Sequence, residues 1–457
     1  MSRKKRDFKN FALAFLLIAA IYQTGTLWLE NYSGHNFFYY MSALGKSNVG
    51  ENITSEALDA EYITVGYGNK MFGVLYGEKG NEIKKCADEV IKQAVDKSII
   101  EGSEEIVLSE ILDKKSVVFS MPFESLVSDY INALDADATG QNVYDYTFDS
   151  IVVIPAEGVN EENTAYFVNS ASNTAVVAGG VFDDGQKLLT LIDETEETYI
   201  YDLQYISTAQ SGFNIFSKNI FVPQWTQSSF EYIPVTEKTI FDMSDESDFI
   251  TKLEPFFGRY YGQSVDMKTS GEFTISDDEV VVKYTDKKIL EYYSYKTEDE
   301  SVTQNTYSAY EACREFLNND ETLKTDYYLS QIQIKNNAIS FSFDYCIDNM
   351  PIVLTEETEE GKVRTHAMEV VVKNNAVKNY RRYAVNFEKS GEDNMNAEND
   401  FLMAVNDAAT FAGDGGQLTA IDDMVLGYGL GKNGLYSLKW FTEFEGKVYV
   451  TDTEGAE

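Results

Sequence analysis

The chain of 457 residues contains two histidines, His35 and His366, so a nucleophile that uses histidine as its base has to involve one of them. His35 follows an apolar N-terminal segment, and His366 lies in a polar approach to an expected strand. Neither has an evident catalytic partner in the sequence, and no GxSxG or HExxH pattern occurs. The 75 acidic residues offer too many candidates to identify a catalytic carboxylate pair. We therefore predict no catalytic residues and expect that the protein is not an enzyme.

One string, from Gly429 to Gly434, matches the GxGxxG pattern of dinucleotide-binding loops. Such a site needs a helix directly after the glycines and a βαβ unit around them. Residues 435–440 instead alternate as a strand does, and Asn433 stands where a phosphate-binding loop of the Walker type needs serine or threonine. We interpret the string as a hairpin turn.

A second string begins at Asp135 and continues through Asp137, Thr139 and Gly140, like the start of a calcium-binding EF-hand loop. The twelfth position should be a bidentate glutamate, but Tyr146 stands there, and a strand rather than a helix is expected to follow. A degenerate calcium site is the alternative to an ordinary solvated loop, which we favour. We accordingly expect no metal site and no cofactor.

An apolar segment near the N-terminus is expected to place the chain relative to the membrane. Residues 10–29 carry no charge, and a helix of this length spans about 30 Å, the thickness of the hydrocarbon core of a bilayer. Trp28 and Tyr32 suit the outer interface, and the positive-inside rule places the N-terminus in the cytoplasm. The basic residues that determine this topology are Arg3, Lys4, Lys5, Arg6 and Lys9.

We therefore predict a single-pass protein of the cell membrane with an extracellular ectodomain. A cleaved signal peptide is the alternative, but the small-residue cleavage pattern that it requires is absent, and apolar character resumes at residues 27–29. The expected organisation is a tail at 1–10, a transmembrane helix at 11–29, a stalk at 30–60, and three modules at 61–238, 239–390 and 391–457.

The modules are expected to have an α+β fold with antiparallel sheets and helices packed on them. Asn-Lys at 69–70 and two Lys-Asn-Asn-Ala turns at 335–338 and 373–376 predict hairpins. Helices are predicted to begin at residues 81 and 122 and to span 245–256, 306–317 and 396–411. Strands are predicted at 62–77 (a hairpin), 150–154, 165–168, 174–177, around 199–205, at 279–285, 287–295, 421–428, 434–442 and 446–452.

Composition limits the classes of partner. The net charge is −38, and because the first ten residues hold five of the 37 basic and one of the 75 acidic residues, the remainder carries −42. Such a surface repels nucleic acid and anionic lipid headgroups. Three cysteines, Cys86, Cys313 and Cys346, are far apart and odd in number, so no disulfide framework is expected. Cys313 lies on an apolar helical stripe, where a buried free thiol is the usual state.

The layout resembles the YycH/YycI family of membrane-anchored accessory proteins, and its length is similar to YycH rather than to the shorter YycI. The resemblance covers the anchor and is best after residue 240; the family's usual proline before the last tryptophan is replaced by Leu438. The residues that carry it are Thr24, Leu27 and Trp28, Lys288-Ile-Leu-Glu-Tyr292, Met350-Pro351, Tyr380-Arg-Arg382, Ile421, Leu426-Gly-Tyr428 and Trp440.

The resemblance implies a regulator without enzymatic activity in a Gram-positive cell-envelope two-component system. Its partners would be a WalK-like sensor histidine kinase and a YycI-like sister protein. Gln23, Thr24 and Gly25 interrupt the apolar span, and we predict that they contact a partner helix, since lipid cannot satisfy a glutamine side chain. Water at the outer interface is the alternative way to satisfy them. The alternative function is an extracytoplasmic ligand-binding or envelope-assembly protein without kinase contact.

Overall fold

The structure is a computed structural model. It describes residues 60–100, 102–136, 146–158, 160–199, 203–213, 215–225, 229–242, 244–257, 265–269, 271–296, 305–335, 337–359, 361–391, 394–412 and 420–453. The predicted tail, transmembrane helix and stalk lie outside these ranges, apart from residue 60. No helix within the described ranges is long and apolar enough to cross a membrane.

The first lobe, residues 60–224, is built on an antiparallel sheet with the strand order β3-β7-β6-β5-β4-β1-β2-β8-β9. Its strands are β1 Tyr62–Tyr67, β2 Phe72–Leu75, β3 Ser103–Glu105, β4 Lys115–Leu126, β5 Thr147–Ile154, β6 Asn163–Asn169, β7 Thr174–Gly180, β8 Gln204–Ser207 and β9 Phe221–Gln224. Its helices are η1 Gly77–Gly80, α3 Asn81–Lys97, α4 Leu108–Ile111, α5 Val127–Ala133, α6 Gly185–Tyr199 and α7 Thr208–Ser211.

The second lobe, residues 229–453, is built on a larger sheet with the order β12-β13-β14-β15-β22-β21-β17-β18-β25-β26-β11-β23, to which β16 and β27 add. These strands are β11 Val235–Thr239, β12 Val265–Thr269, β13 Glu272–Ser276, β14 Val280–Thr285, β15 Ile289–Ser294, β16 Tyr327–Lys335, β17 Ala338–Ile347, β18 Met350–Ile352, β21 Met368–Lys373, β22 Ala376–Tyr383, β23 Val385–Lys389, β25 Asp423–Leu430, β26 Tyr436–Phe444 and β27 Lys447–Asp452.

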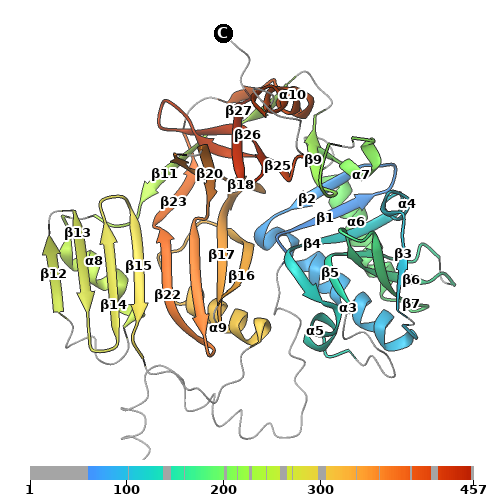
Figure 1. Ribbon diagram of the computed structural model, residues 1–457, viewed down its shortest axis with the longest axis horizontal. Helices are drawn as coiled ribbons and strands as arrows, with labels where there is room; N and C mark the ends of the chain where they lie inside the picture. The colour runs from blue at the N-terminus through green and yellow to red at the C-terminus, as the bar shows by residue number, and fades with distance from the viewer. Residues whose placement is uncertain are drawn as a thin grey trace, which may run out of the picture.

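Two small sheets and four helices complete the described part of the second lobe. The small sheets pair β10 Phe230–Tyr232 with β24 Met395–Ala397, and β19 Leu354–Thr358 with β20 Gly361–Thr365. The helices are α8 Glu246–Leu253, η2 Glu254–Phe256, α9 Thr306–Asn318 and α10 Phe401–Ala412. Figure 1 shows the first lobe at the right and the second lobe at the left and top. The predicted α+β class with mainly antiparallel sheets is thus confirmed, and strands on both sides of residue 390 share the second sheet.

The tight turns follow from asparagine, which tolerates the left-handed backbone region at low cost. Asn374 and Asn375 both have positive φ, 51° and 55°, and they join β21 to β22. Asn69 and Lys70 do the same between β1 and β2. These predicted hairpins are confirmed, as is the turn at Gly434, which joins β25 to β26. The GxGxxG string is therefore a hairpin and not a nucleotide-binding loop.

Three local predictions were wrong. The helix expected at 396–411 begins only at Phe401, because Met395–Ala397 forms β24, which pairs with β10. Pro122 does not begin a helix: it lies within β4, and α5 begins at Val127. The register between β4 and β5 shifts between Ser120 and Ser125, and the residues between them are not paired with β5. Pro122, which has no N–H to donate, is therefore tolerated within this strand. The strand expected around 199–205 begins only at Gln204, because α6, which was not predicted, extends to Tyr199.

Helices pack on the faces of both sheets. In the first lobe, Ile63 and Val65 of β1 share a buried cluster with Val90 and Ile91 of α3. In the second lobe, Phe249 of α8 lies 4.2 Å from the ring of Phe273, and Phe316 and Tyr310 of α9 pack on Tyr380 and Phe341. These alternating inward side chains are the reason that each sheet has a buried face. The thiol of Cys313 in α9 is buried and free, as predicted.

Candidate functional site at the junction of the two lobes

The residues that the sequence singled out for function lie outside the described part of the chain. This holds for the helix-contact residues Gln23, Thr24 and Gly25, for the basic residues at positions 3–9, and for Trp28, Tyr32 and His35. The calcium-like string is described only as far as residue 136; β5 follows it, so the predicted strand after the loop is confirmed. Groups that the fold brings together from distant parts of the sequence are therefore the candidates for a site.

The fold brings His366 next to a serine and a carboxylate that the sequence keeps far apart. The Nδ1 atom of His366 lies 3.0 Å from Oγ of Ser330 and 3.3 Å from both carboxylate oxygens of Asp344. A catalytic triad needs the aspartate on one ring nitrogen and the serine on the other, so that the ring passes a proton between them. Here the same nitrogen faces both groups, and the arrangement does not activate Ser330 as a nucleophile.

Asp344 is the centre of this group and is almost fully buried. Nη2 of Arg364 donates to its Oδ2 at 2.8 Å and to the Tyr328 hydroxyl at 3.2 Å, and the backbone N–H of Ala367 donates to its Oδ1 at 3.2 Å. Burial raises the pKa of the Asp344 carboxyl, but Arg364, His366 and the N–H of Ala367 lower it to about 2. Asp344 therefore stays ionised and holds β20 against β17.

The first lobe contributes Glu61 to the same charged cluster. Its backbone N–H donates to the carbonyl oxygen of Ser120 at 2.8 Å, which fixes it beside β4. Burial and the Asp423 carboxylate raise the pKa of Glu61 to about 7, while Arg364 and Lys218 act in the opposite direction. Asp423 in turn lies 3.7 Å from Nη1 of Arg364. Charges from both lobes thus interact across the junction.

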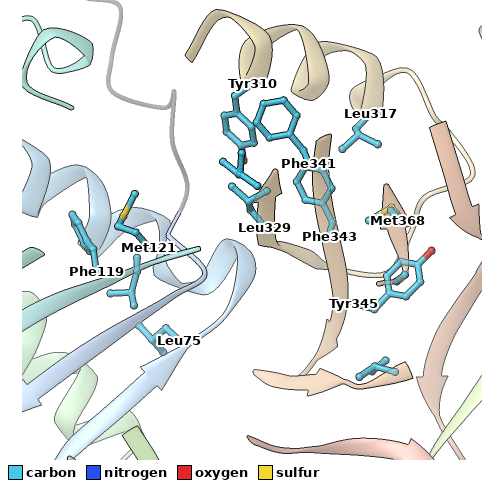
Figure 2. Packing of buried hydrophobic residues seen from close by; sticks show 14 of the residues in the cluster. Leu75, Phe119, Met121, Tyr310, Leu317, Leu329, Phe341, Phe343, Tyr345 and Met368 are labelled. Atoms are coloured by element: carbon cyan, nitrogen blue, oxygen red, sulfur yellow. The ribbon is translucent and has the colours of Figure 1, made fainter. Parts of the chain in front are cut away.

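Two cavities meet at Glu61. The first, of about 270 Å³, is lined by Ile63 and Leu75 from the first lobe and by Tyr310, Leu329 and Phe343 from the second. Figure 2 shows Leu75 on one side of this region and Tyr310, Leu329 and Phe343 on the other. The second cavity, of about 230 Å³, lies on the first lobe and includes the Lys218 and Asp149 side chains. The junction is therefore packed incompletely around its charged centre.

The side chain of Asn349 joins the two lobes next to these cavities. Asn349 lies in the turn between β17 and β18, with a positive φ of 69°. Its Oδ1 accepts a hydrogen bond from the backbone N–H of Tyr76 at 2.6 Å, and its Nδ2 donates to the carbonyl oxygen of Val74. One side chain thus satisfies two backbone groups at the end of β2, as another strand would. Sequence reasoning missed Asn349, although the Asp-Asn pair at 348–349 is a turn signal like those it used.

The residues that carried the resemblance have structural roles in the second lobe. Arg382 is fully buried and forms an ion pair of 2.7 Å with Asp320, while its Nε donates to the hydroxyl of Tyr345. Trp440 is also fully buried, and its Nε1 donates to the carbonyl oxygen of Asn399 at 2.8 Å. Arg382 fixes the segment after α9 to the sheet, and Trp440 fixes the segment after β24. Neither side chain is available to a ligand.

Close backbone contact explains another part of the resemblance. A Cβ atom on Gly427 would lie 2.7 Å from the carbonyl oxygen of Pro351, so only glycine allows β25 to approach β18 in parallel. Lys288 has a positive φ of 62° and its ammonium pairs with Glu237, which also accepts from the hydroxyl of Tyr383. Within the described ranges, no group of three histidine, cysteine or acidic side chains is placed to hold a metal ion.

The similarity of this chain to known proteins is found in its fold and not in its sequence. No family model and no curated protein matches the sequence. The crystal structure of YycH from Bacillus subtilis matches 87% of this chain and 96% of that chain, with a TM-score of 0.52 and 10% sequence identity. The chain has the YycH fold. The predicted resemblance, including the preference for YycH, is confirmed at this level.

A second solved structure, an uncharacterized protein from Eubacterium rectale, covers 54% of this chain and 89% of that chain at 8% identity. Its TM-score of 0.29 is too low to carry an argument. The match to YycH includes both lobes, since it extends over most of each chain. The YycH fold is thus built here with almost no shared sequence, through buried contacts such as those of Arg382 and Trp440.

Proposed function

We propose that this chain is a membrane-anchored extracytoplasmic regulator of a sensor histidine kinase, of the WalK type, in a cell-envelope two-component system. The observation that carries the proposal is the YycH fold over 87% of the chain. The predicted transmembrane helix would place the two lobes outside the cell and bring the span beside the helices of the kinase. The chain would act without catalysis, which agrees with a His366 site that lacks the geometry of a triad.

The proposed mechanism is a bias on the two states of the kinase. Contacts that Gln23, Thr24 and Gly25 make with a partner helix would differ between these states, and an interhelical hydrogen bond is worth about 1–2 kcal/mol at best. A difference of that size shifts a two-state equilibrium about five- to thirtyfold. The lobes would hold the partner, a kinase ectodomain or a YycI-like sister protein, while the helix transmits the bias.

Exchange of the anchor tests this proposal against the ligand-binding alternative. Residues 1–29 are replaced by an unrelated single-pass anchor of the same length and orientation, and the output of the kinase's response regulator is measured at equal expression. We expect output to lose its dependence on this protein, because the bilayer contacts are gone. Full function with the foreign anchor would contradict the proposal and favour an extracytoplasmic binding or envelope-assembly role.

A smaller change separates the helix contact from the anchor itself. The double variant Gln23→Leu, Thr24→Val keeps the span apolar while it removes the polar side chains. We expect it to insert normally and to change kinase output about five- to thirtyfold, whereas replacing two apolar residues of the span, Leu16→Val and Ile18→Leu, should leave output unchanged. Unchanged output in the first variant would limit regulation to the ectodomain.

The proposal also requires that the anchor is retained. We expect the protein from cells to include residues 1–30 and to remain in the membrane fraction after a carbonate wash. An N-terminal sequence that begins after residue 20 would identify a cleaved signal peptide instead. Mild crosslinking of the intact protein in membranes, followed by identification of the captured partner, then tests the kinase contact directly.

A further inference from the structure

One face of the second sheet is left uncovered by the described helices. Helices α8 and α9 pack on the opposite face, where Phe273, Tyr284 and Tyr380 point. Because side chains alternate along a strand, the intervening residues of β14, β15, β22 and β21 point away from these helices. Arg381 and Glu369, for example, are exposed, and Lys283 and Glu291 are partly exposed.

The charged side chains on this face form a ladder across four strands. Lys283 is opposite Glu291, Glu291 is opposite Arg381, and Arg381 is opposite Glu369. The signs therefore alternate as plus, minus, plus, minus over a width of roughly 14 Å, at about 4.8 Å between strands. The ladder has no net charge, although the whole chain carries −38.

A second row runs beside the ladder and is less polar. Val281 is opposite Tyr293, Tyr293 is opposite Asn379, and Asn379 is opposite Val371. Val281, Tyr293 and Val371 are each partly exposed, so apolar surface remains for a partner to cover. Aromatic residues and arginine, here Tyr293 and Arg381, are enriched in protein interfaces relative to the rest of the surface.

The order of charges makes this face complementary to the same face of a second copy of this chain. A two-fold axis parallel to the strands and midway between β15 and β22 places Glu291 over Arg381 of the second copy, and Lys283 over Glu369. Every charge then meets one of opposite sign, and Val281 meets Val371. Elsewhere the strongly acidic surfaces of two copies repel each other, so this balanced face is where they can approach.

We propose that the face formed by β14, β15, β22 and β21 is the interface of a homodimer in which two copies pack sheet against sheet. The sheets would lie about 10 Å apart, as in other face-to-face packings. The dimer does not depend on any contact with a kinase, because it rests on this face alone. It would present two first lobes, and therefore two junction sites, to further partners.

Charge exchange between copies gives a sharp test. Two differently tagged full-length copies are co-expressed, lightly crosslinked in membranes, and the second tag captured with the first is measured. Arg381→Glu in both copies sets glutamate against Glu291 twice, and Glu291→Arg in both sets arginine against Arg381 twice. We expect each to lower capture about tenfold or more, since both contacts change from attraction to repulsion.

Mixing the variants restores the interface only if the contact is between copies. When one copy carries R381E and the other E291R, both contacts again pair opposite signs, so we expect capture near the wild-type level. Each chain still has the same altered neighbours within its own sheet, and a folding defect would therefore persist in the mixture. Lys238→Glu, on an exposed residue of β11 away from this face, is the matched control and should have no effect.

Position-specific crosslinking completes the test. One copy carries Tyr293→Cys and the other Asn379→Cys, and a bismaleimide of about 10 Å is added. We expect a crosslinked dimer from this pair and none from Lys238→Cys; the native cysteines are buried. The absence of rescue in the mixture overturns the homodimer. Capture through this face of a different chain, with no self-pairing, overturns it as well and assigns the face to that partner.

Discussion

Replacing Glu61 by glutamine should stabilise the protein at alkaline pH and leave it unchanged at acidic pH. Glu61 lies at the junction of the lobes, partly buried and close enough to Asp423 for the two carboxylates to repel each other. Glutamine has nearly the same shape and carries no charge. The substitution therefore removes the cost of ionising Glu61 and little else.

The size of the effect follows from the pKa. Burial first, and then Asp423, raise the pKa of Glu61 from 4.5 in the unfolded chain to about 7 in the folded one. Between these values the folded protein binds more protons than the unfolded chain, so the contribution of Glu61 to the free energy of unfolding is highest below pH 4.5 and falls as pH rises through 7. The full shift corresponds to about 3 kcal/mol, and partial exposure to solvent reduces it to about 1–2 kcal/mol.

Urea denaturation of the full-length protein and the Glu61→Gln variant at pH 5 and pH 8 measures this difference. We expect a smaller gain for the variant at pH 5, where Glu61 is protonated in the folded protein but has begun to ionise in the unfolded chain, and a gain of about 1–2 kcal/mol at pH 8. Contributions from Asp344, whose pKa is lowered to about 2, are common to both proteins and cancel. Glu311→Gln, on an exposed residue of α9, serves as the control.

A variant that is less stable than the wild type at pH 8 would refute this reasoning. It would mean that the attraction of Glu61 to Arg364 and Lys218 outweighs burial and the repulsion from Asp423. An equal difference at both pH values would also count against it, because an uncharged role such as packing does not depend on pH. Only a difference that grows between pH 5 and pH 8 agrees with a titrating carboxyl at the junction.

Three further predictions concern the framework. Arg382→Met should lower the free energy of unfolding by about 3–5 kcal/mol in urea denaturation, because Asp320 is left as a buried charge without its partner. Asn349→Gly keeps the positive φ but removes both bonds to β2, and we expect a loss of about 1–3 kcal/mol and faster hydrogen exchange at Tyr76. Neither a chelator nor a reductant should shift the melting temperature by more than a few degrees; a larger shift would reveal a metal or a disulfide.

Much of the fold was predictable because its signals are local. Asparagine tolerates positive φ, so a pair such as Asn374-Asn375 between two alternating apolar runs identifies a hairpin without knowledge of the rest of the chain. The helix α9 begins with a capping box in which Asn305 accepts from the N–H of Ser308, and it continues with an apolar stripe. The apolar period therefore located the start of α3, and the bounds of α9 and of α8 with η2, to within a residue or two.

The errors arose where tertiary contacts override local preference. Pro122 usually begins a helix or ends a strand, but a shift of register lets β4 continue through it. Helix α6 was not predicted because its second half is acidic and its buried stripe, Leu188 and Ile192, is short. The junction itself could not be predicted, because Ser330, Asp344 and His366 meet only when β16, β17 and the segment after β20 are assembled.

Strand β22 contains two adjacent residues with different roles, one in the fold and one on the surface. Arg382 points inward, where its ion pair with Asp320 fixes the chain that follows α9 to the sheet, so its loss damages the fold itself. Arg381, one residue earlier, must point outward, because side chains alternate along a strand, and it belongs to the charge ladder instead. A motif of adjacent arginines therefore combines a residue that specifies the fold with one that remains available to a partner. The same alternation implies that substitutions at Arg381 can change association while the YycH fold stays intact.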